Sequence, residues 1–472
     1  MKNLKKKVCL IVDNPSRDLD GLILLSHHLV GPNIDIYLVP MYFQNLEIPA
    51  ICPDLIVINF LRKENLELVK SYSKAGIQVV VIDTEGGIWE SEDQFIKSIQ
   101  HKGNEKYISK YLFWGEAQME AFLFTTQWSK CKVAVTGCQR YDLYNSKYQK
   151  TLLDNESCHK NSLVFISNFG LGYPRYARSP EVEIKNMINS GYDEEYCKKR
   201  VKHDVESHEN FIKIITKLAI DFPQERILLR CHPFEDEKDY QRKLSSFSNV
   251  CIQREGVVAN VLVDAKLIFH LNSTVAVDAC LLGKYPYNLG WISTEITKGI
   301  SSIPNRISKE ISSYKDLVAL VNSKVTNQEF KLPIEIERNF YKCDGLNSKR
   351  ISDEILLLLK KASVPNELIC KKYLLYGINL SILYMTEALI RKFLGAKNYI
   401  YLRTNYLVKN PFRNKKRDKL FSLPRVENLL KKINDCLEIK SSKLIECTVP
   451  EKEISLDNRG IGASIRLSVK LK

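Results

Sequence analysis

The sequence predicts an α/β protein with two parallel sheets, each covered by helices on both faces. Three observations support this fold class. Short apolar runs rich in Val and Ile recur from the N-terminus to about residue 290, and segments with helical periodicity separate them. Strands of a parallel sheet are buried on both faces and therefore read as nearly continuous apolar runs. The pattern stops at the polar segment 155–161 and then starts again, which divides the chain into two α/β units.

The first unit is expected to contain six strands in quick succession. They are expected at 7–13, 34–39, 55–59, 78–83, 111–114 and 133–136. Helices are predicted at 22–29 and 64–74. The second of these is closed by Gly76, because a glycine just past the last turn is a common helix end.

The second unit begins with an apolar run at 163–170 and continues with helical periodicity that is clearest at 206–220. Two strand–loop–helix units follow, with strands at 227–230 and 267–271, and a patterned helix at 347–361 closes this part of the chain. We predict a first Rossmann-like domain at 1–154 and a second at 162–345. A closing helix at 346–362 and a basic helical extension at 363–472 follow. A cleft is expected where two such domains face each other.

Two loops in the second domain predict a phosphate site. Cys231-His232-Pro233-Phe234-Glu235 follows the strand 227–230, and Asn272-Ser273-Thr274 precedes a predicted helix at 275–282. Backbone N–H groups at the start of a helix point outward and bind anions. Arg230 and Asp278 are close in sequence to these loops. Together these groups indicate a pocket for a nucleotide monophosphate or diphosphate, although a histidine that caps a loop and ordinary Ser/Thr helix caps would give the same local pattern.

The net charge of +15 is concentrated in one segment. Residues 364–420 hold twelve Lys/Arg against three Asp/Glu, or 12 − 3 = +9. This predicts an anionic partner, and no nucleic-acid-binding pattern is present. The run 373–395 is interrupted by polar residues and falls short of a membrane span. An amphipathic helix on an anionic membrane surface is expected there, with a small domain bearing a solvated basic face as the alternative.

The thirteen cysteines show no CxxC spacing, so neither a zinc site nor a disulfide framework is predicted. No apolar export signal follows the N-terminal lysines, so the expected location is the cytoplasm. No cluster of metal-ligand residues is evident, so the predicted activity is metal-independent, requires no cofactor and is insensitive to EDTA.

Several motifs together resemble the bacterial surface-carbohydrate biosynthesis proteins. This family is related to the retaining β-Kdo transferases of capsule and O-antigen assembly and, more distantly, to the polyol-phosphate transferases of teichoic acid synthesis. The matching segments are 17–21, 83–87, 114–115 with Gln118, 135–142, 168–170, 230–233, 272–274 with Asp278, and 341–345. Two positions depart from the family pattern. Gln139 stands where a proline is usual, and the loop 168–175 has no carboxylate where the Kdo transferases have an aspartate nucleophile.

The resemblance implies a GT-B glycosyltransferase, and the basic segment 364–420 predicts that it lies at the inner face of the cytoplasmic membrane. Its first domain would hold a lipid-linked glycan acceptor, and its second a nucleotide sugar, with Kdo or a related nonulosonic acid linked to CMP as the expected donor. The donor-binding residues would be Arg230, His232, Asn272, Ser273, Thr274, Asp278 and Asn168. Candidates for acceptor or anion contacts are Arg17, Asp18, Asp20 and Arg140, with surface salt bridges as the alternative for the two arginines.

The predicted catalytic residues are Glu85, Asp83 and His232. A carboxylate at the end of the strand 78–83 is suited to deprotonate an acceptor hydroxyl. Glu85 is favoured as this base, and Asp83 and Asp20 remain open. Rival functions are polyol-phosphate transfer from a CDP donor, sugar transfer from UDP or GDP, UDP-sugar epimerisation without an acceptor, and nucleotide binding without catalysis.

Overall fold

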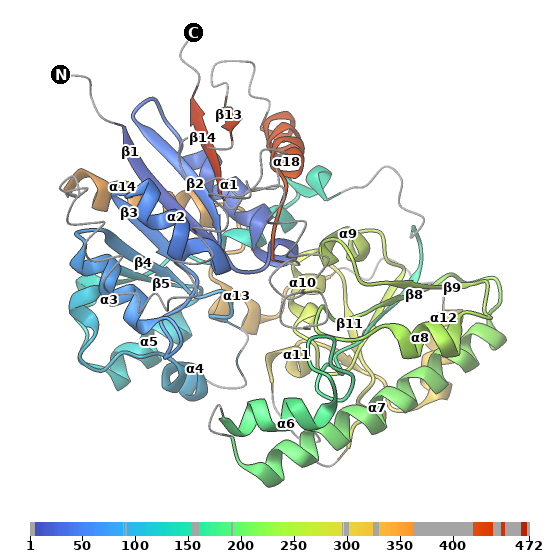
Figure 1. Ribbon diagram of the computed structural model, residues 1–472. Helices are drawn as coiled ribbons and strands as arrows, with labels where there is room; N and C mark the ends of the chain where they lie inside the picture. The colour runs from blue at the N-terminus through green and yellow to red at the C-terminus, as the bar shows by residue number, and fades with distance from the viewer. Residues whose placement is uncertain are drawn as a thin grey trace, which may run out of the picture. The chain divides into compact units, whose positions relative to one another are not determined.

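The computed structural model divides into two compact units, residues 1–151 with 337–472, and residues 152–336 (Figure 1). The structure describes residues 5–87, 89, 92–152, 160–189, 192–294, 296, 302–323, 330–361, 419–437, 445–448 and 464–469. Each unit contains a parallel sheet with helices, so the predicted α/β class with two Rossmann-like domains is confirmed. The predicted membrane-surface segment 373–395, and all of the basic stretch except Lys419 and Leu420, lie outside the described residues.

Unit 1 is built on a sheet in the order β13-β14-β2-β1-β3-β4-β5-β6. The first six strands in the chain are parallel, and all six were predicted to within about one residue at each end. Their bounds are β1 (Lys6–Val12), β2 (Ile34–Pro40), β3 (Leu55–Ile58), β4 (Gln78–Ile82), β5 (Lys110–Phe113) and β6 (Val133–Val135). The order reverses between β1 and β3, and in open α/β sheets ligands bind beyond the carboxyl ends of the strands at such a point.

Helices cover the sheet of unit 1 and bury its apolar side chains. Tyr72, Phe95 and Phe122, from three different helices, pack in one cluster with alternate strand residues such as Cys9 and Tyr37. The helices of unit 1 are α1 (Asp20–Leu29), α2 (Gln44–Ile51), α3 (Leu66–Lys74), α4 (Glu92–Ser98), α5 (Glu116–Thr125), α14 (Asn347–Lys361) and α18 (Leu423–Cys436). α13 (Ile334–Phe340) carries the chain back from unit 2. α1 packs against both α14 and α18.

The C-terminal part of the chain joins unit 1 in a way that the sequence analysis did not anticipate. β14 (Ile465–Val469) pairs antiparallel with β2, and β13 (Ile445–Thr448) pairs with β14 (Figure 1). The hydroxyl of Ser464 donates to the buried carboxylate of Glu47 at 2.6 Å and fixes the start of this added strand. The extension therefore contributes two strands as well as helix α18. Residues 337–345, predicted in the second domain, belong to unit 1.

A carboxylate from the loop after β6 holds α14 in unit 1. The backbone N–H groups of Asn347 and Ser348 donate to Asp142 at 2.9 and 2.6 Å, and the side-chain amide of Asn347 donates to the Cys138 carbonyl at 3.1 Å. Asp142 thus satisfies two N–H groups that the first turn of a helix leaves without an intrahelical partner. The bounds predicted for this helix are confirmed.

We expect Gly137→Ala to destabilise the protein by about 3 kcal/mol. Gly137 has φ +77°, and an added Cβ would lie 2.1 Å from Oδ1 of Asn347. Gly76→Ala is the matched control, because Gly76 has φ +85° with nothing within 4 Å of an added Cβ. It should cost only about 1 kcal/mol, the backbone strain alone. Chemical denaturation of both variants measures the difference, and equal losses would contradict the close packing of α14 at Gly137.

Unit 2 is built on a parallel sheet in the order β12-β11-β10-β7-β8-β9. Read from the other edge, the order of its strands along the chain is 3-2-1-4-5-6, that of a dinucleotide-binding Rossmann domain. The strands are β7 (Leu163–Ile166), β8 (Ile227–Arg230), β9 (Val250–Gln253), β10 (Leu267–His270), β11 (Pro286–Asn288) and β12 (Lys309–Glu310). The order reverses between β7 and β10.

Two apolar clusters hold the helices of unit 2 against this sheet. Phe165 and Phe269 pack with residues of α7, α8 and α12, and Val164 and Ile268 pack with residues of α9 and α10. The helices are α6 (Pro180–Asn189), α7 (Glu194–Asp221), α8 (Lys238–Leu244), α9 (Val258–Leu262), α10 (Val275–Leu281), α11 (Ile303–Arg306) and α12 (Tyr314–Asn322). Across the ranges that the structure describes, none of the helices has the length and apolar character needed to cross a membrane.

Candidate functional site

The two predicted phosphate loops leave the same edge of the unit 2 sheet. β8 and β10 both pair with β7, and Arg230, Ile166 and His270 lie in register at the three carboxyl ends. Because neighbouring strands are about 4.8 Å apart, the loops after β8 and β10 begin roughly 10 Å from each other. They flank the position where the strand order reverses. The sequence analysis therefore placed both loops at the edge where a Rossmann domain binds its ligand.

The ring of His232 is oriented by its own loop. The backbone N–H of Phe234 donates to Nδ1 of His232 at 3.2 Å. Nδ1 must then be the unprotonated nitrogen of the neutral ring, so the proton is on Nε2. The side chain is half-buried. This tautomer makes Nε2–H a hydrogen-bond donor, as the predicted contact with a donor phosphate requires.

Glu235 anchors the His-Pro loop, and the sequence analysis did not single it out. Its buried carboxylate accepts from the Tyr240 hydroxyl at 2.7 Å, from the His232 backbone N–H at 3.2 Å and from the Ser167 hydroxyl. Ser167 directly follows β7, so Glu235 ties the loop after β8 to the loop after β7. Burial raises the pKa of Glu235 to about 7 against the opposing effect of these hydrogen bonds.

We expect Glu235→Gln to change how stability depends on pH. Because the pKa of Glu235 rises from 4.5 to about 7 on folding, the folded protein keeps this proton while the unfolded chain loses it. The contribution of Glu235 to the free energy of unfolding of wild type is fully present below pH 4.5. It falls by on the order of 3 kcal/mol as the pH rises to 7. Glutamine does not titrate. Its oxygen can still face Ser167 and His232, with its amide towards the Tyr240 hydroxyl.

Urea denaturation of both proteins at pH 5 and pH 8 checks this expectation. The free energy of unfolding of wild type minus that of Glu235→Gln should fall from pH 5 to pH 8. Contributions from other buried carboxylates are the same in both proteins and cancel in this difference. A difference that stays constant or increases with pH would contradict a protonated Glu235.

Arg230 supports a neighbouring loop. Its guanidinium donates to the carbonyls of Glu255 and Gly256, and the side chain is buried. Burial lowers the pKa of Arg230 to about 10. The sequence analysis predicted a contact between Arg230 and the donor phosphate. Two carbonyls of the loop after β9 accept from this side chain, and the contact with a donor phosphate stays a prediction.

The Asn272-Ser273-Thr274 loop is held by buried polar groups. Nδ1 of His270 accepts from the Ser273 backbone N–H at 3.2 Å, and Nε2 lies 2.8 Å from the Ser308 hydroxyl. Burial lowers the pKa of His270 to about 3, so this ring is neutral. Asn272 has φ +46°, and its Oδ1 accepts from the Ser302 hydroxyl at 2.6 Å. His270 and Ser302, which lie outside the motif, thus fix the conformation of this loop.

The remaining donor-site candidates occupy different environments. Ser273 and Asp278 are buried, Thr274 is half-buried, and Asn168, after β7, is exposed. The loop 168–175 has no acidic residue, but Asp204 from α7 accepts from the backbone N–H groups of Leu171 and Gly172 at 2.9 and 3.4 Å. A buried carboxylate thus supports this loop without belonging to it. Among the donor-site candidates, Asn168 is exposed, and Asn272, Thr274 and His232 are half-buried.

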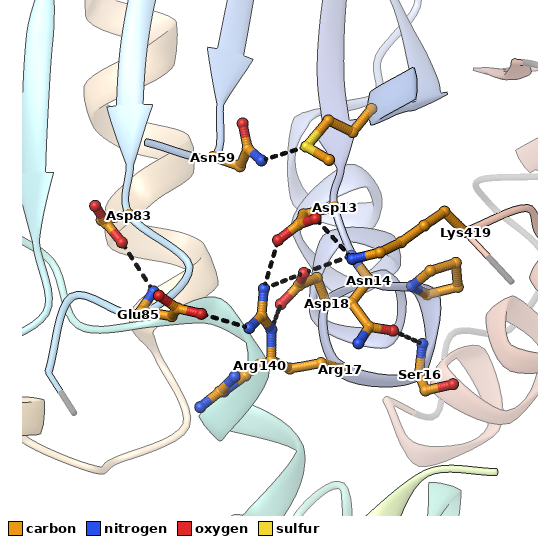
Figure 2. Close-up of polar contacts among 12 residues, drawn as sticks. Asp13, Asn14, Ser16, Arg17, Asp18, Asn59, Asp83, Glu85, Arg140 and Lys419 are labelled. Atoms are coloured by element: carbon orange, nitrogen blue, oxygen red, sulfur yellow. Dashed lines mark hydrogen bonds and ion pairs between the residues drawn. The ribbon is translucent and has the colours of Figure 1, made fainter. Parts of the chain in front are cut away.

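The candidates in unit 1 form an ion-pair network at the carboxyl ends of β1 and β4 (Figure 2). The guanidinium of Arg17 donates to Asp18 at 2.7 Å, to Asp13 at 2.8 Å and to Glu85 at 3.4 Å. Burial alone would lower the pKa of Arg17, but the charges of Asp18 and Asp13 outweigh it and raise this pKa. Asp18 also accepts from the Asn14 backbone N–H at 2.9 Å, which fixes the turn after β1. Arg17 therefore forms salt bridges, which the sequence analysis gave as the alternative to an anion contact for this residue.

Glu85 and Asp83 differ in exposure. The side chain of Glu85 is 37% exposed, whereas that of Asp83 is 1% exposed. Asp83 accepts from the backbone N–H of Glu85 at 2.9 Å, and Arg62 donates to both carboxylates at 3.2 Å. Burial raises the pKa of Asp83 to about 6, with the charge of Arg62 opposing the shift. Asp83 therefore supports the loop, and Glu85 is the carboxylate of the pair that a substrate can reach.

Arg140 and Asp20 complete the predicted set in unit 1. The Arg140 guanidinium lies 5.1 Å from the ring centre of Trp114 and donates to the Tyr141 hydroxyl. An added Cβ on Gly21 would lie 2.5 Å from Cα of Arg140, so α1 and the loop after β6 touch backbone to backbone. Asp20 accepts from Arg425 at 3.0 Å. The side chain of Asp20 is 18% exposed, against 37% for Glu85, so Glu85 is the more accessible of the two carboxylates.

The sequence analysis missed Arg62, Lys419, Glu235 and Asp204. The first two contact Asp83, Glu85 and Asp13 from remote segments, and no local pattern marks them. Glu235 carried a signal, since it closes the His-Pro loop in which His232 was identified. Within the described ranges, no group of three or more His, Cys, Asp or Glu side chains is arranged to hold a metal ion.

Comparisons with known proteins identify similarity in structure only. No protein-family model and no curated protein matches the sequence. A UDP-GlcNAc 2-epimerase of Methanocaldococcus jannaschii, solved with UDP-GlcNAc and UDP, is 13% identical with a TM-score of 0.45, over 75% of this chain and 99% of that one. A putative UDP-N-acetylglucosamine 2-epimerase of Listeria monocytogenes is 15% identical with a TM-score of 0.47, over 77% and 99%. The wall teichoic acid polymerase TagF is 15% identical with a TM-score of 0.48, over 76% and 90%. This chain is therefore similar in structure to enzymes that act on nucleotide sugars or build a surface polymer, and at these values the similarity assigns it no activity.

Proposed function

We propose that this protein is a metal-independent glycosyltransferase of surface polysaccharide assembly, with a nucleotide sugar as donor. The observation that carries the proposal is the arrangement of unit 2. Its strands follow the order of a dinucleotide-binding domain, and both motif loops leave the sheet beside the point where that order reverses. His232 and the Asn272-Ser273-Thr274 loop bind the donor phosphate, and Glu235 and His270 hold these loops in place.

The donor is proposed to be an acidic sugar linked to CMP, Kdo or a related nonulosonic acid. Support for this class comes from the sequence motifs, which resemble those of the β-Kdo transferases. The acceptor is proposed to be a lipid-linked glycan, held by unit 1. The excess of basic residues at 364–420 supports binding to the anionic inner face of the cytoplasmic membrane. Flotation with acidic and neutral liposomes tests this location, and equal recovery from both would exclude an electrostatic attachment.

In the proposed reaction, Glu85 takes the proton of the acceptor hydroxyl. The acceptor oxygen forms a bond to the anomeric carbon, and the bond from that carbon to the phosphate oxygen breaks. The nucleotide leaves with the electron pair, and Nε2–H of His232 stabilises the phosphate oxygen on which negative charge develops. Because the loop 168–175 offers no carboxylate, we propose a single displacement without a covalent intermediate at that loop.

Thermal unfolding with CMP, CDP, UDP and GDP tests the donor class. A nucleotide at 100 times its Kd stabilises the folded protein by about 2.7 kcal/mol. CMP is expected to raise the melting temperature, and EDTA is expected to leave this shift unchanged. Stabilisation by UDP or GDP but not by CMP would contradict the CMP donor, and stabilisation by CDP alone would favour polyol-phosphate transfer. A protein that no nucleotide stabilises would refute the proposed site in unit 2.

A further inference from the structure

A residue from the C-terminal part of the chain completes the ion-pair network of unit 1. Lys419 donates to Oδ1 of Asp13 at 2.9 Å, and Lys419 is only 8% exposed (Figure 2). α18 begins four residues later at Leu423, and Arg425 donates to the Pro15 carbonyl at 2.9 Å and to Asp20 at 3.0 Å. Two basic side chains of this segment therefore contact the turn between β1 and α1, which carries the predicted acceptor residues.

Positive and negative side chains alternate through the network. The Lys419–Asp13 pair is followed by Arg17 to Asp13 at 2.8 Å and Arg17 to Glu85 at 3.4 Å. Arg62 then joins Glu85 and Asp83, at 3.2 Å each. In order, the chain of charges runs Lys419, Asp13, Arg17, Glu85, Arg62 and Asp83. Because each carboxylate lies between two cations or beside one, no member is left with an uncompensated charge.

Lys419 and Arg17 both donate to the carboxylate of Asp13. Arg17 donates to Asp13, Asp18 and Glu85, and the longest of these contacts is the one to Glu85. The side chains of Asp13 and Asp18 are 14% and 4% exposed, so their charges are weakly screened by water. Without Lys419, Arg17 would be the one cation partner of Asp13 in the described part of the chain, and Asp13 would draw the guanidinium away from Glu85. Lys419 thus limits the attraction of Asp13 for Arg17.

We infer that Lys419 is a positioning residue of the acceptor site, acting through Asp13 and Arg17 on the carboxylate of Glu85. The segment at 419–437 is then a functional part of unit 1 in addition to any role in membrane attachment. The inference rests on the proposed function for its catalytic consequence, because it assigns Glu85 the role of base. The ion pair itself is independent of that role.

The experiment compares Lys419→Met with Lys431→Met in the full-length protein. Lys431 is an exposed lysine on α18 and serves as the matched control. Lys419→Met should lower kcat for sugar transfer about 10-fold with the KM for the nucleotide sugar unchanged, since donor binding belongs to unit 2. Lys419→Arg should restore most of the activity, because arginine keeps the charge next to Asp13.

A double variant separates positioning from general support of the fold. If Lys419 acts through Asp13, Asp13→Asn removes the charge that Lys419 balances, and Lys419→Met should then cost at most about 2-fold more in kcat. Activity of Lys419→Met equal to that of Lys431→Met, or a loss that stays 10-fold in the Asp13→Asn background, would overturn the inference.

Thermal unfolding of the same variants distinguishes failure of this inference from failure of the proposed function. Lys419→Met should lower the melting temperature of wild type by about 3 °C and that of Asp13→Asn by much less. If wild type transfers no sugar, the proposed function fails while this comparison still tests the ion pair. If wild type is active and the two melting-temperature shifts are equal, the link from Lys419 to Asp13 is refuted and the proposed function stands.

Discussion

Glu85→Gln is expected to lower kcat for sugar transfer by about 10³-fold while nucleotide affinity stays unchanged. A positioned general base contributes 10²- to 10⁴-fold to a rate. Glutamine has nearly the same shape and still accepts a hydrogen bond from Arg17 or Arg62, but it cannot take a proton from an acceptor hydroxyl. The exposure of the Glu85 side chain, 37% against 18% for Asp20 and 1% for Asp83, singles it out.

Steady-state kinetics with saturating acceptor measures this effect, and Glu120→Gln on the exposed surface of α5 is the matched control. Asp83→Asn is a second comparison. It should lower both activity and stability, because Asp83 accepts from the Glu85 backbone N–H and from Arg62. If Glu85→Gln retained wild-type kcat while Asp83→Asn or Asp20→Asn abolished it, the assignment of the base would be wrong.

His232→Asn is expected to weaken binding of the nucleotide donor by about 10- to 100-fold. A hydrogen bond to a charged group contributes about 1.5–3 kcal/mol, and each 1.4 kcal/mol corresponds to tenfold in affinity. Asparagine places an oxygen where Nδ1 now accepts from the Phe234 N–H, so the loop keeps its internal hydrogen bond. It has no group at the position of Nε2, so the proposed donor to the phosphate is removed.

His232→Gln is the complementary variant for this test. Glutamine carries an amide NH₂ near the position of Nε2 and lacks the acceptor for Phe234. Isothermal titration of both variants should therefore show that Gln retains more nucleotide affinity than Asn. Equal affinities of wild type and His232→Asn would mean that His232 only holds its loop, the alternative that the sequence left open.

Local sequence patterns were sufficient to predict the parallel strands that end at the candidate sites. Within β4, residues 79–82 are all apolar and β-branched, and β8 and α14 have the bounds that their patterns indicated. Such runs carry their own signal, because burial on both faces requires every residue to be apolar. The strands β13 and β14 carried no such signal, since each is short and acquires its partner from a distant part of the chain.

For the candidate site, too, local sequence patterns indicated the residues near strand ends but not the contacts between distant segments. His232, Glu85 and the Asn272-Ser273-Thr274 loop come soon after strands, so the rule that ligands bind at the carboxyl ends of parallel strands was enough to propose them as site residues. The contacts of Arg230 with the carbonyls of Glu255 and Gly256 were not predictable, because these carbonyls belong to a loop about 25 residues later. Lys419 lies 406 positions from Asp13, and only the folded chain brings the two together.

A crystal structure of the full-length protein with a bound nucleotide is the most direct test of the central claim, that unit 2 binds the donor phosphate beyond β7, β8 and β10. The phosphate is expected within hydrogen-bond distance of Nε2 of His232 and of the Asn272-Ser273-Thr274 loop. Nucleotide bound at the opposite edge of this sheet, or in unit 1 beside Arg17, would contradict the claim.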